Sequence, residues 1–226
     1  MNVDLSTYST LVFDCDGVVL DSNRIKTEAF RTAAMPWGEA ATNALVDHHV
    51  SNGGISRYNK FAHFLDNIIP QHALNTLVGE RESIIEKLLS TYAAEVRAGL
   101  MNCIVADGLQ ELRTATREAT WLIVSGGDQA ELREVFALRG LDHLFDGGIF
   151  GSPEDKDTIL ASRIASGGIS PRALFIGDSL YDYEAATRAG LDFIFAYGWT
   201  EVSSWEEFAN QNGIRTIESI SKLIHE

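Results

Sequence analysis

The sequence has few of the features that mark secreted, membrane-bound or nucleic-acid-binding proteins. Its 226 residues contain two cysteines, Cys15 and Cys103, without the spacing of a metal site, which favours a reducing compartment over a disulfide scaffold. Basic residues are scarce: 18 Lys and Arg against 32 Asp and Glu give a net charge of -14, which disfavours binding to nucleic acids or anionic membranes. No apolar run approaches membrane-spanning length, and the N-terminal segment lacks the basic region and apolar core of a signal peptide. We therefore expect a cytoplasmic protein with neither a membrane nor a nucleic-acid partner; its oligomeric state stays open.

One stretch stands out, residues 11–23, which reads LVFDCDGVVLDSN. Leu11, Val12 and Phe13, with Thr10 before them, form a short apolar run that predicts a buried strand. Asp14 and Asp16 follow it directly, and carboxylates at the mouth of a buried strand are costly to desolvate unless a cation or hydrogen bonds compensate them. The pair favours a metal-assisted site. Cys15, between them, is expected to pack as a small buried residue because strand alternation turns it away from its neighbours.

The rest of the chain divides into a helical part and an alternating part. Residues 22–98 carry helical periodicity, broken by a loop at 51–54, and predict helices at about 22–34, 37–50, 56–67 and 71–96. Further along, strands are expected at 121–124, 148–150, 173–176, 193–195 and 214–217, with helices between them at 108–119, 128–139, 156–165, 182–189 and near 204, and a last helix after them. Strands that alternate with helices imply a parallel sheet covered on both faces. We expect an α/β core of residues 1–21 and 99–226, interrupted by a helical domain of residues 22–98.

Polar side chains follow several of these strands. Asp14 and Asp16 come after the first, Ser125 after the second, and Asp178 and Asp182 after a later one. In an open α/β sheet the loops at the carboxyl ends of the strands share one crevice near the topological switch point. The fold class therefore predicts that these side chains converge.

That set of residues suits phosphoryl transfer. Carboxylates without an accompanying His or Cys favour Mg²⁺ over zinc. Ser125 and the backbone N–H of Gly126 are expected to hold phosphate oxygens beside a helix N-terminus, and Lys156 to supply positive charge. Asp14 is suited to accept a phosphoryl group as nucleophile. Asp16 is placed to protonate the leaving oxygen and later to deprotonate water.

The ordered motifs resemble those of a known superfamily. The segment from Asp14 to Ser22, the pair Ser125–Gly126, Lys156 within GSPEDK and the run GDSLYD at 177–182 resemble the four motifs of the haloacid dehalogenase superfamily. Within it, the chain is similar to phosphatases related to phosphoglycolate phosphatase and β-phosphoglucomutase, and the resemblance spans nearly the whole chain.

The resemblance implies a Rossmann-like core with an α-helical cap inserted between the first two motifs. It implies a Mg²⁺-dependent phosphatase that acts on a small phosphorylated metabolite, such as a sugar phosphate or sugar-acid phosphate, through an aspartyl phosphate. It implies Asp14 as nucleophile and Asp16 as acid and base. Mg²⁺ would be held by Asp14, the Asp16 backbone carbonyl and Asp178, with Asp182 in support. The phosphoryl group would be held by Ser125 and Lys156.

Some positions separate branches of the superfamily. Asp16 argues against the dehalogenases and phosphonate hydrolases, which lack this second aspartate. Lys26 stands where the mutases carry a histidine, which weakens a phosphosugar mutase as the alternative. Residues 54–57 resemble the mutase segment whose arginine binds the non-transferring phosphate, so Arg57 is a candidate for contact with the far end of the substrate. A catalytically silent binding protein on the same fold is the remaining alternative.

Each candidate also has an ordinary structural interpretation. Asp178–Ser179 is typical of a helix N-cap, and Ser125–Gly127 is typical of a strand-to-helix turn. Lys156 is also consistent with an ordinary solvent-exposed lysine. Arg57 and Lys60 are also typical of exposed charges on a helix. The histidines of the helical part, at positions 48, 49, 63 and 72, show no ligand spacing and are expected to be exposed or hydrogen-bonded.

Overall fold

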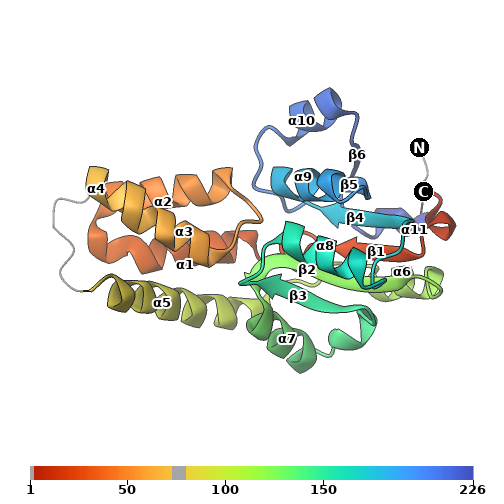
Figure 1. The fold of residues 1–226 in the computed structure, drawn as a ribbon, viewed down its shortest axis with the longest axis horizontal. Coiled ribbons are helices and arrows are strands. Elements are labelled where there is room, and N and C mark those ends of the chain that lie inside the picture. The colour runs from red at the N-terminus through yellow and green to blue at the C-terminus, as the bar shows by residue number, and fades with distance from the viewer. Residues whose placement is uncertain (1–2, 73–79, 226) are drawn as a thin grey trace.

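The computed structural model describes residues 3–72 and 80–225, and a parallel β-sheet forms the centre of its α/β part (Figure 1). Within these ranges the sheet has six strands in the order β3-β2-β1-β4-β5-β6. The strands are β1 (Thr10–Phe13), β2 (Thr120–Asp128), β3 (Gly148–Ser152), β4 (Ala173–Gly177), β5 (Asp192–Ala196) and β6 (Arg215–Ile217). The first strand is therefore central although most of the sheet comes from the second half of the chain. The predicted α/β fold is confirmed.

Side-chain alternation along the strands assigns helices to the two faces of the sheet. Leu11 and Phe13 pack in the apolar cluster that includes α6 (Leu109–Ala115) and α7 (Gln129–Leu138). Val12 points to the other face, where it packs with residues of α8 (Lys156–Ala165) and α9 (Leu180–Arg188). The chain ends with α10 (Trp205–Asn212) and α11 (Lys222–His225).

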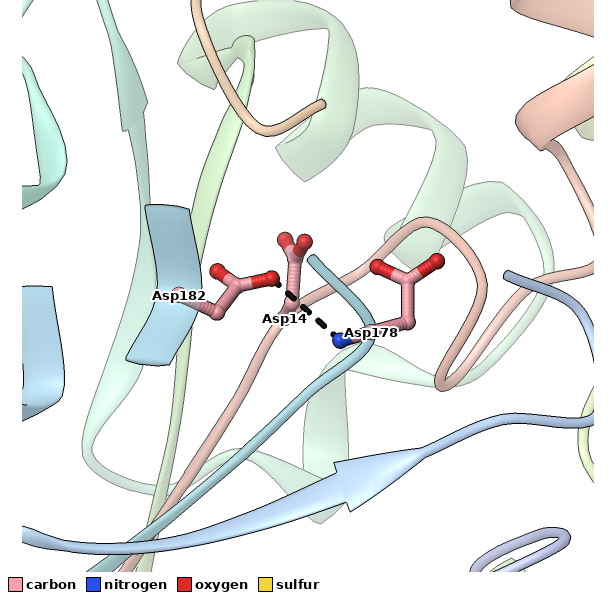
Figure 2. A group of neighbouring side chains, drawn as sticks. All are labelled: Asp14, Asp178 and Asp182. Carbon is pink, nitrogen blue, oxygen red and sulfur yellow. Dashed lines mark hydrogen bonds between the residues drawn. The ribbon is translucent and has the colours of Figure 1, made fainter. Parts of the chain in front are cut away.

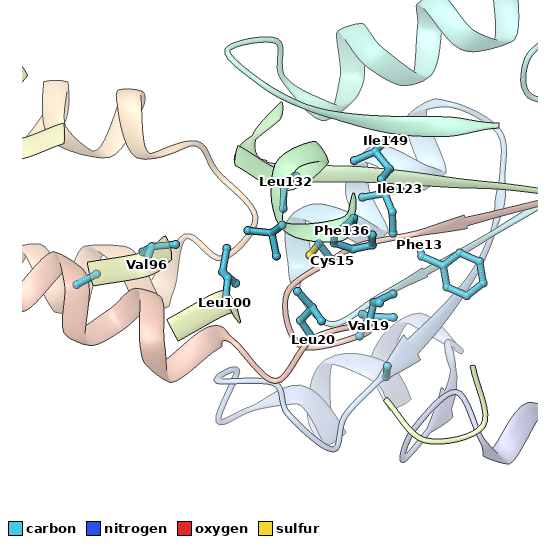
Figure 3. Packing of buried hydrophobic residues seen from close by; sticks show 14 of the residues in the cluster. Phe13, Cys15, Val19, Leu20, Val96, Leu100, Ile123, Leu132, Phe136 and Ile149 are labelled. Atoms are coloured by element: carbon cyan, nitrogen blue, oxygen red, sulfur yellow. The ribbon is translucent and has the colours of Figure 1, made fainter. Parts of the chain in front are cut away.

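Cys15 continues the alternation that begins at Leu11 and Phe13. It is fully buried in the same apolar cluster, with Val19, Leu20 and Phe136 (Figure 3). The prediction that Cys15 is a packed residue is confirmed.

The helices α1 to α5, which lie between β1 and β2 in the chain, form a helical block at one end of the sheet, and the carboxyl ends of β1, β2 and β4 face it (Figure 1). The block contains α1 (Asn23–Ala34), α2 (Glu39–Ser51), α3 (Arg57–His63), a π-helical turn (Phe64–Ile68), α4 (Ile69–His72) and α5 (Arg81–Asn102). Its core includes the rings of Phe30, Phe61 and Tyr92, with centroids 4.4 to 5.8 Å apart. Leu74, Leu77 and Val78, which were expected on the last of these helices, lie outside the described residues. No helix in the described ranges is long and apolar enough to cross a membrane.

Strand β2 runs further than its sequence indicates. We expected it to end at Val124, but it continues through Ser125, Gly126 and Gly127 to Asp128, with an irregularity in its pairing to β3. The glycines act here through close backbone approach rather than through a turn: a Cβ on Gly151 of β3 would overlap the Gly127 carbonyl oxygen. Helix α7 then begins directly after Asp128, whose side chain caps it by accepting from the Glu131 N–H.

Candidate active site

Asp14 is fixed at the carboxyl end of β1. Its N–H donates to the Ile176 carbonyl of β4 (2.9 Å), and its Oδ1 accepts from the Cys15 N–H (2.7 Å). Its Oδ2 lies 2.9 Å from Nζ of Lys156, and only 3% of the residue is exposed. Burial raises the pKa of Asp14 to about 7, while the Lys156 ammonium opposes that shift. The carboxylate is held in one orientation by the sheet and by a single cation.

Lys156 joins two carboxylates beneath the surface. It is the first residue of α8, is 1% exposed, and pairs with both Asp14 and Asp182. The interpretation of Lys156 as a solvated lysine is therefore wrong. Asp182 is itself fully engaged, because its second oxygen accepts from the N–H and the hydroxyl of Ser179, which caps α9. The expected N-cap is thus present and holds Asp182 where it meets Lys156.

Asp178 follows β4 and comes close to the loop after β1. Its carboxylate accepts from Nδ2 of Asn23 (2.7 Å), and its backbone carbonyl accepts from the Thr200 hydroxyl (2.6 Å). Gly17 has φ of +73°, and a Cβ there would overlap the Asp178 carboxylate, so the position requires glycine twice over. Burial, together with the negative charges of Asp14 and Asp182, raises the pKa of Asp178 well above its ordinary value.

The three carboxylates form an acidic cluster with the chemistry of a cation site (Figure 2). Asp14, Asp178 and Asp182 each offer an oxygen, and these oxygens lie within 4.8 Å of one another. With Lys156 as their one described ion-pair partner, two negative charges stay uncompensated when all three are ionised. Oxygen-only donors and a deficit of two charges fit a hard divalent cation. Asp182 is the most enclosed of the three, because Lys156, Ser179 and the Asp178 N–H all donate to it, so Asp14 and Asp178 offer an ion the more accessible oxygens.

Asp16 lies beside this cluster and has its own cation. Its carboxylate pairs with Lys26 and accepts from the Ser22 hydroxyl. Burial acts to raise the pKa of Asp16, but the charge and hydrogen bonds of Lys26 and Ser22 bring the pKa below its ordinary value. Ser22 stands at the N-cap position of α1, yet its hydroxyl donates to Asp16 and makes no hydrogen bond that caps the helix. Sequence reasoning missed both Asn23 and Lys26 as site residues, although their i, i+3 spacing in the first turn of α1 places them on one face.

The residues expected to hold phosphate lie under a loop of the helical block. Ser125 is fully buried, and its hydroxyl accepts from the Gly127 N–H (3.0 Å). Gly126 packs against the backbone of Gly54, so closely that a Cβ on Gly126 would overlap the Gly54 carbonyl oxygen. Gly54, with φ of +80°, also lies over Lys156. In this arrangement Asp14, Asp16, Gly126 and Asp178 line a pocket, whereas Ser125, Lys156 and Asp182 are not among its lining residues.

The opposite wall of the pocket comes from the helical block. Arg57 of α3 lines it, but its guanidinium donates to both oxygens of Glu131 on α7 (3.1 and 2.7 Å) and lies over the Tyr92 ring. Its contact with a substrate stays a prediction. Lys60 also lines the pocket and is only 2% exposed, so the interpretation of Lys60 as an exposed charge is wrong. The positions of Arg57, Lys60, Phe61 and Phe64, at i, i+3, i+4 and i+7, were the signal for a buried helix face.

Comparison with known proteins agrees with this fold. Three crystal structures are similar over most of the chain. A predicted phosphatase from Clostridium acetobutylicum is 18% identical, with 96% of this chain and 97% of that chain covered and a TM-score of 0.72. A predicted phosphoglycolate phosphatase from Haemophilus somnus 129pt is 19% identical (84% and 85% covered, TM-score 0.65), and CbbY from Rhodobacter sphaeroides in complex with phosphate is 20% identical (96% and 96% covered, TM-score 0.68). No curated protein matches the chain. At these identities the structures establish the fold alone. The model of haloacid dehalogenase-like hydrolases, however, matches residues 8–190, and the chain belongs to that hydrolase family.

Proposed function

We propose that this hydrolase is a Mg²⁺-dependent phosphatase that releases phosphate from a small phosphorylated metabolite through an aspartyl phosphate on Asp14. The observation that carries the proposal is the buried Asp14 carboxylate, 2.9 Å from Lys156, beside Asp178 and in the pocket that Asp16 lines. This arrangement provides a nucleophile in Asp14, a cation for the phosphoryl group in Lys156 and a second carboxylate for proton transfer in Asp16.

We further propose that residues 22–98 act as a cap on a core formed by residues 1–21 and 99–226. Two contacts between the parts support this arrangement: Gly54 packs against Gly126 of β2, and Arg57 pairs with Glu131 of α7. A closed cap excludes bulk water from the pocket, and an open cap admits the ester to Ser125 and Lys156.

In the first step, an Asp14 oxygen attacks phosphorus, the bond from phosphorus to the ester oxygen breaks, and Asp16 gives its proton to the departing alcohol. In the second step, water attacks phosphorus while Asp16 takes a proton from it, and Asp14 leaves as a free carboxylate with release of inorganic phosphate.

Lys26 favours the ionised form of Asp16, which suits the second step. The negative charge of an arriving phosphate ester acts in the opposite direction and favours the protonated form that the first step needs. Lys156 favours the ionised form of Asp14 and, in this proposal, meets the charge of the phosphoryl oxygens.

A Mg²⁺ ion held by Asp14, Asp178 and the Asp16 backbone carbonyl would neutralise the acidic cluster and the phosphoryl oxygens. Asp182 would contribute by fixing Lys156 rather than by binding the ion.

The test is phosphate release from a panel of phosphorylated metabolites, with Mg²⁺ and with EDTA, using Asp14→Asn as the blank. We expect Mg²⁺-dependent release that is absent from the variant. An isomeric phosphate in place of free phosphate would mean a mutase, and neither product with any ester would mean a binding protein.

A further inference from the structure

Lys60 differs from the other buried cations of the protein. Lys26, Arg57 and Lys156 are each at most 7% exposed, and each is paired with a carboxylate. Lys60 is 2% exposed, yet none of the carboxylates that the structure describes forms an ion pair with it. A buried charge without a counter-charge is unfavourable unless something else supplies one.

The partner that Lys60 does have is His49. The Lys60 Nζ lies 2.7 Å from Nδ1 of His49 and 3.4 Å from its backbone carbonyl, and both side chains pack on the Phe30 ring. Since an ammonium only donates, Nδ1 of His49 is the acceptor, and the proton of the neutral imidazole is then on Nε2. That Nε2 atom is buried and has no hydrogen-bond partner.

Lys60 therefore lacks a counter-charge, and the neighbouring Nε2–H of His49 lacks an acceptor. Both residues line the pocket that contains Asp14 and Asp16, and they come from α2 and α3 of the helical block. A neutral hydroxyl would accept a hydrogen bond but leave the charge of Lys60 uncompensated. A carboxylate or phosphate oxygen supplies both the acceptor and the charge.

We propose that Lys60 and His49 form a subsite for a second anionic group of the substrate, a carboxylate or a phosphate, at the end remote from the phosphoryl group that Asp14 receives. This subsite rests on the proposed function, because that function places the reacting phosphoryl group at Asp14 and Lys156. It makes the preferred substrate a phosphate ester with two anionic ends and assigns the recognition of the far end to the cap.

The experiment compares phosphate monoesters of one chain length, three carbons, that end in a hydroxyl, a carboxylate or a second phosphate. We expect kcat/KM to be at least about tenfold higher for one of the two anionic ends than for the hydroxyl end, the range for a hydrogen bond to a charged group. Lys60→Met and His49→Phe should each reduce that preference by about tenfold or more. Lys87→Met, an exposed lysine of α5, is the matched control and should leave the preference unchanged.

Binding without turnover separates the subsite from the proposed function. Calorimetry of the three esters with Asp14→Asn, and with Asp14→Asn combined with Lys60→Met, measures affinity directly. Stronger binding of an anionic end that is lost with Lys60 supports the subsite even when the wild-type protein hydrolyses none of the esters, which would defeat the proposed function alone. Hydrolysis of all three esters at equal kcat/KM, unaffected by Lys60→Met, would overturn the subsite and leave the phosphatase standing. The carboxylate and phosphate arms show which anion the subsite takes.

Discussion

Lys156 Nζ lies 2.9 Å from Asp14 Oδ2 and pairs at the same time with Asp182, and all three side chains are almost fully buried. The Lys156 ammonium thus orients the proposed nucleophile, Asp14, and is itself held in place by Asp182, which Ser179 at the N-cap of α9 fixes. The stability of this region and the reactivity of Asp14 consequently depend on the same side chain.

Replacement of Lys156 with Met should therefore affect both properties. We expect the free energy of unfolding, measured with urea at pH 7 without metal, to fall by about 3 kcal/mol, because two buried carboxylates lose their counter-charge. Phosphate release should be lost as well. Lys87→Met is the control and should stay within about 0.5 kcal/mol of wild type. A Lys156→Met variant as stable as wild type would show that the ion pairs of Lys156 with Asp14 and Asp182 do not hold the site together.

The contact of Gly126 with Gly54 gives a test of cap closure. In Gly126→Ala the added methyl group would meet the Gly54 carbonyl oxygen, so the loop at residues 52–56 could not close fully. We expect kcat/KM to fall by about a hundredfold while the fold is retained, as follows when the reacting groups are displaced by about an ångström. Gly168→Ala is the control, since Gly168 has no positive φ and only ordinary contacts. If Gly126→Ala were as active as this control, the close contact of Gly126 with Gly54 would not be required for catalysis.

The ion pair between Arg57 and Glu131 offers a test with a control on the same helix. Glu131→Gln leaves the buried Arg57 without a counter-charge, and we expect a loss of about 3 kcal/mol in unfolding free energy with faster hydrogen exchange at residues 52–58. Glu134→Gln removes an exposed pair with Arg97 on the next turn of α7 and should cost less than about 1 kcal/mol. Both pairs join the helical block to α7, so equal effects of the two substitutions would mean that the buried Arg57 pair stabilises this contact no more than the exposed one does.

The pH dependence of stability should reveal Lys60. Burial and the nearby charge of Lys26 lower the pKa of Lys60 to about 7, with Lys156 acting in the same direction and Asp16 and Glu201 opposing it. Between that value and about 10.4, the pKa of an unfolded lysine, the unfolded chain binds the extra proton, so stability contributed by this position rises with pH.

We expect the unfolding free energy of wild type to increase between pH 7 and 10 relative to Lys60→Met, with a difference in slope approaching about 1.4 kcal/mol per pH unit. His49, whose pKa is lowered well below its ordinary value, stays neutral in this window and does not contribute. Parallel pH profiles for the two proteins would contradict the assignment of a depressed pKa to Lys60.

Much of the fold follows from periodicity in the sequence. The alternation of strand and helix after residue 99, and the apolar run before Asp14, predict the parallel sheet because burial on both faces requires such patterns. The extension of β2 through Ser125, Gly126 and Gly127 could not be predicted in this way. Glycines ordinarily end strands, and the close approach of Gly127 to Gly151 depends on a partner strand distant in sequence.

The candidate site was predictable in part, and the reason differs between its two halves. Asp14, Asp16 and Asp178 follow strands of one sheet and Ser125 lies in the last part of β2, so the topology alone brings them together. Lys26, the partner of Asp16, comes instead from the helical block, where charged residues are exposed by default.

Lys60 and His49 show the same limit most clearly. Their burial depends on how α2 and α3 pack over Phe30, which no local pattern specifies.

The measurement that tests the central claim most directly is the capture of a phosphoryl group on Asp14. Asp16→Asn removes the base that activates water, and p-nitrophenyl phosphate has a leaving group that departs without an acid, so the aspartyl phosphate should accumulate. Acid quench after mixing with Mg²⁺, followed by mass spectrometry of the peptides, should find the modification on the peptide that contains Asp14, with a burst of nitrophenol equal to the amount of enzyme. Release of nitrophenol by Asp14→Asn at the wild-type rate, or a phosphoryl group on any other residue, would contradict the account.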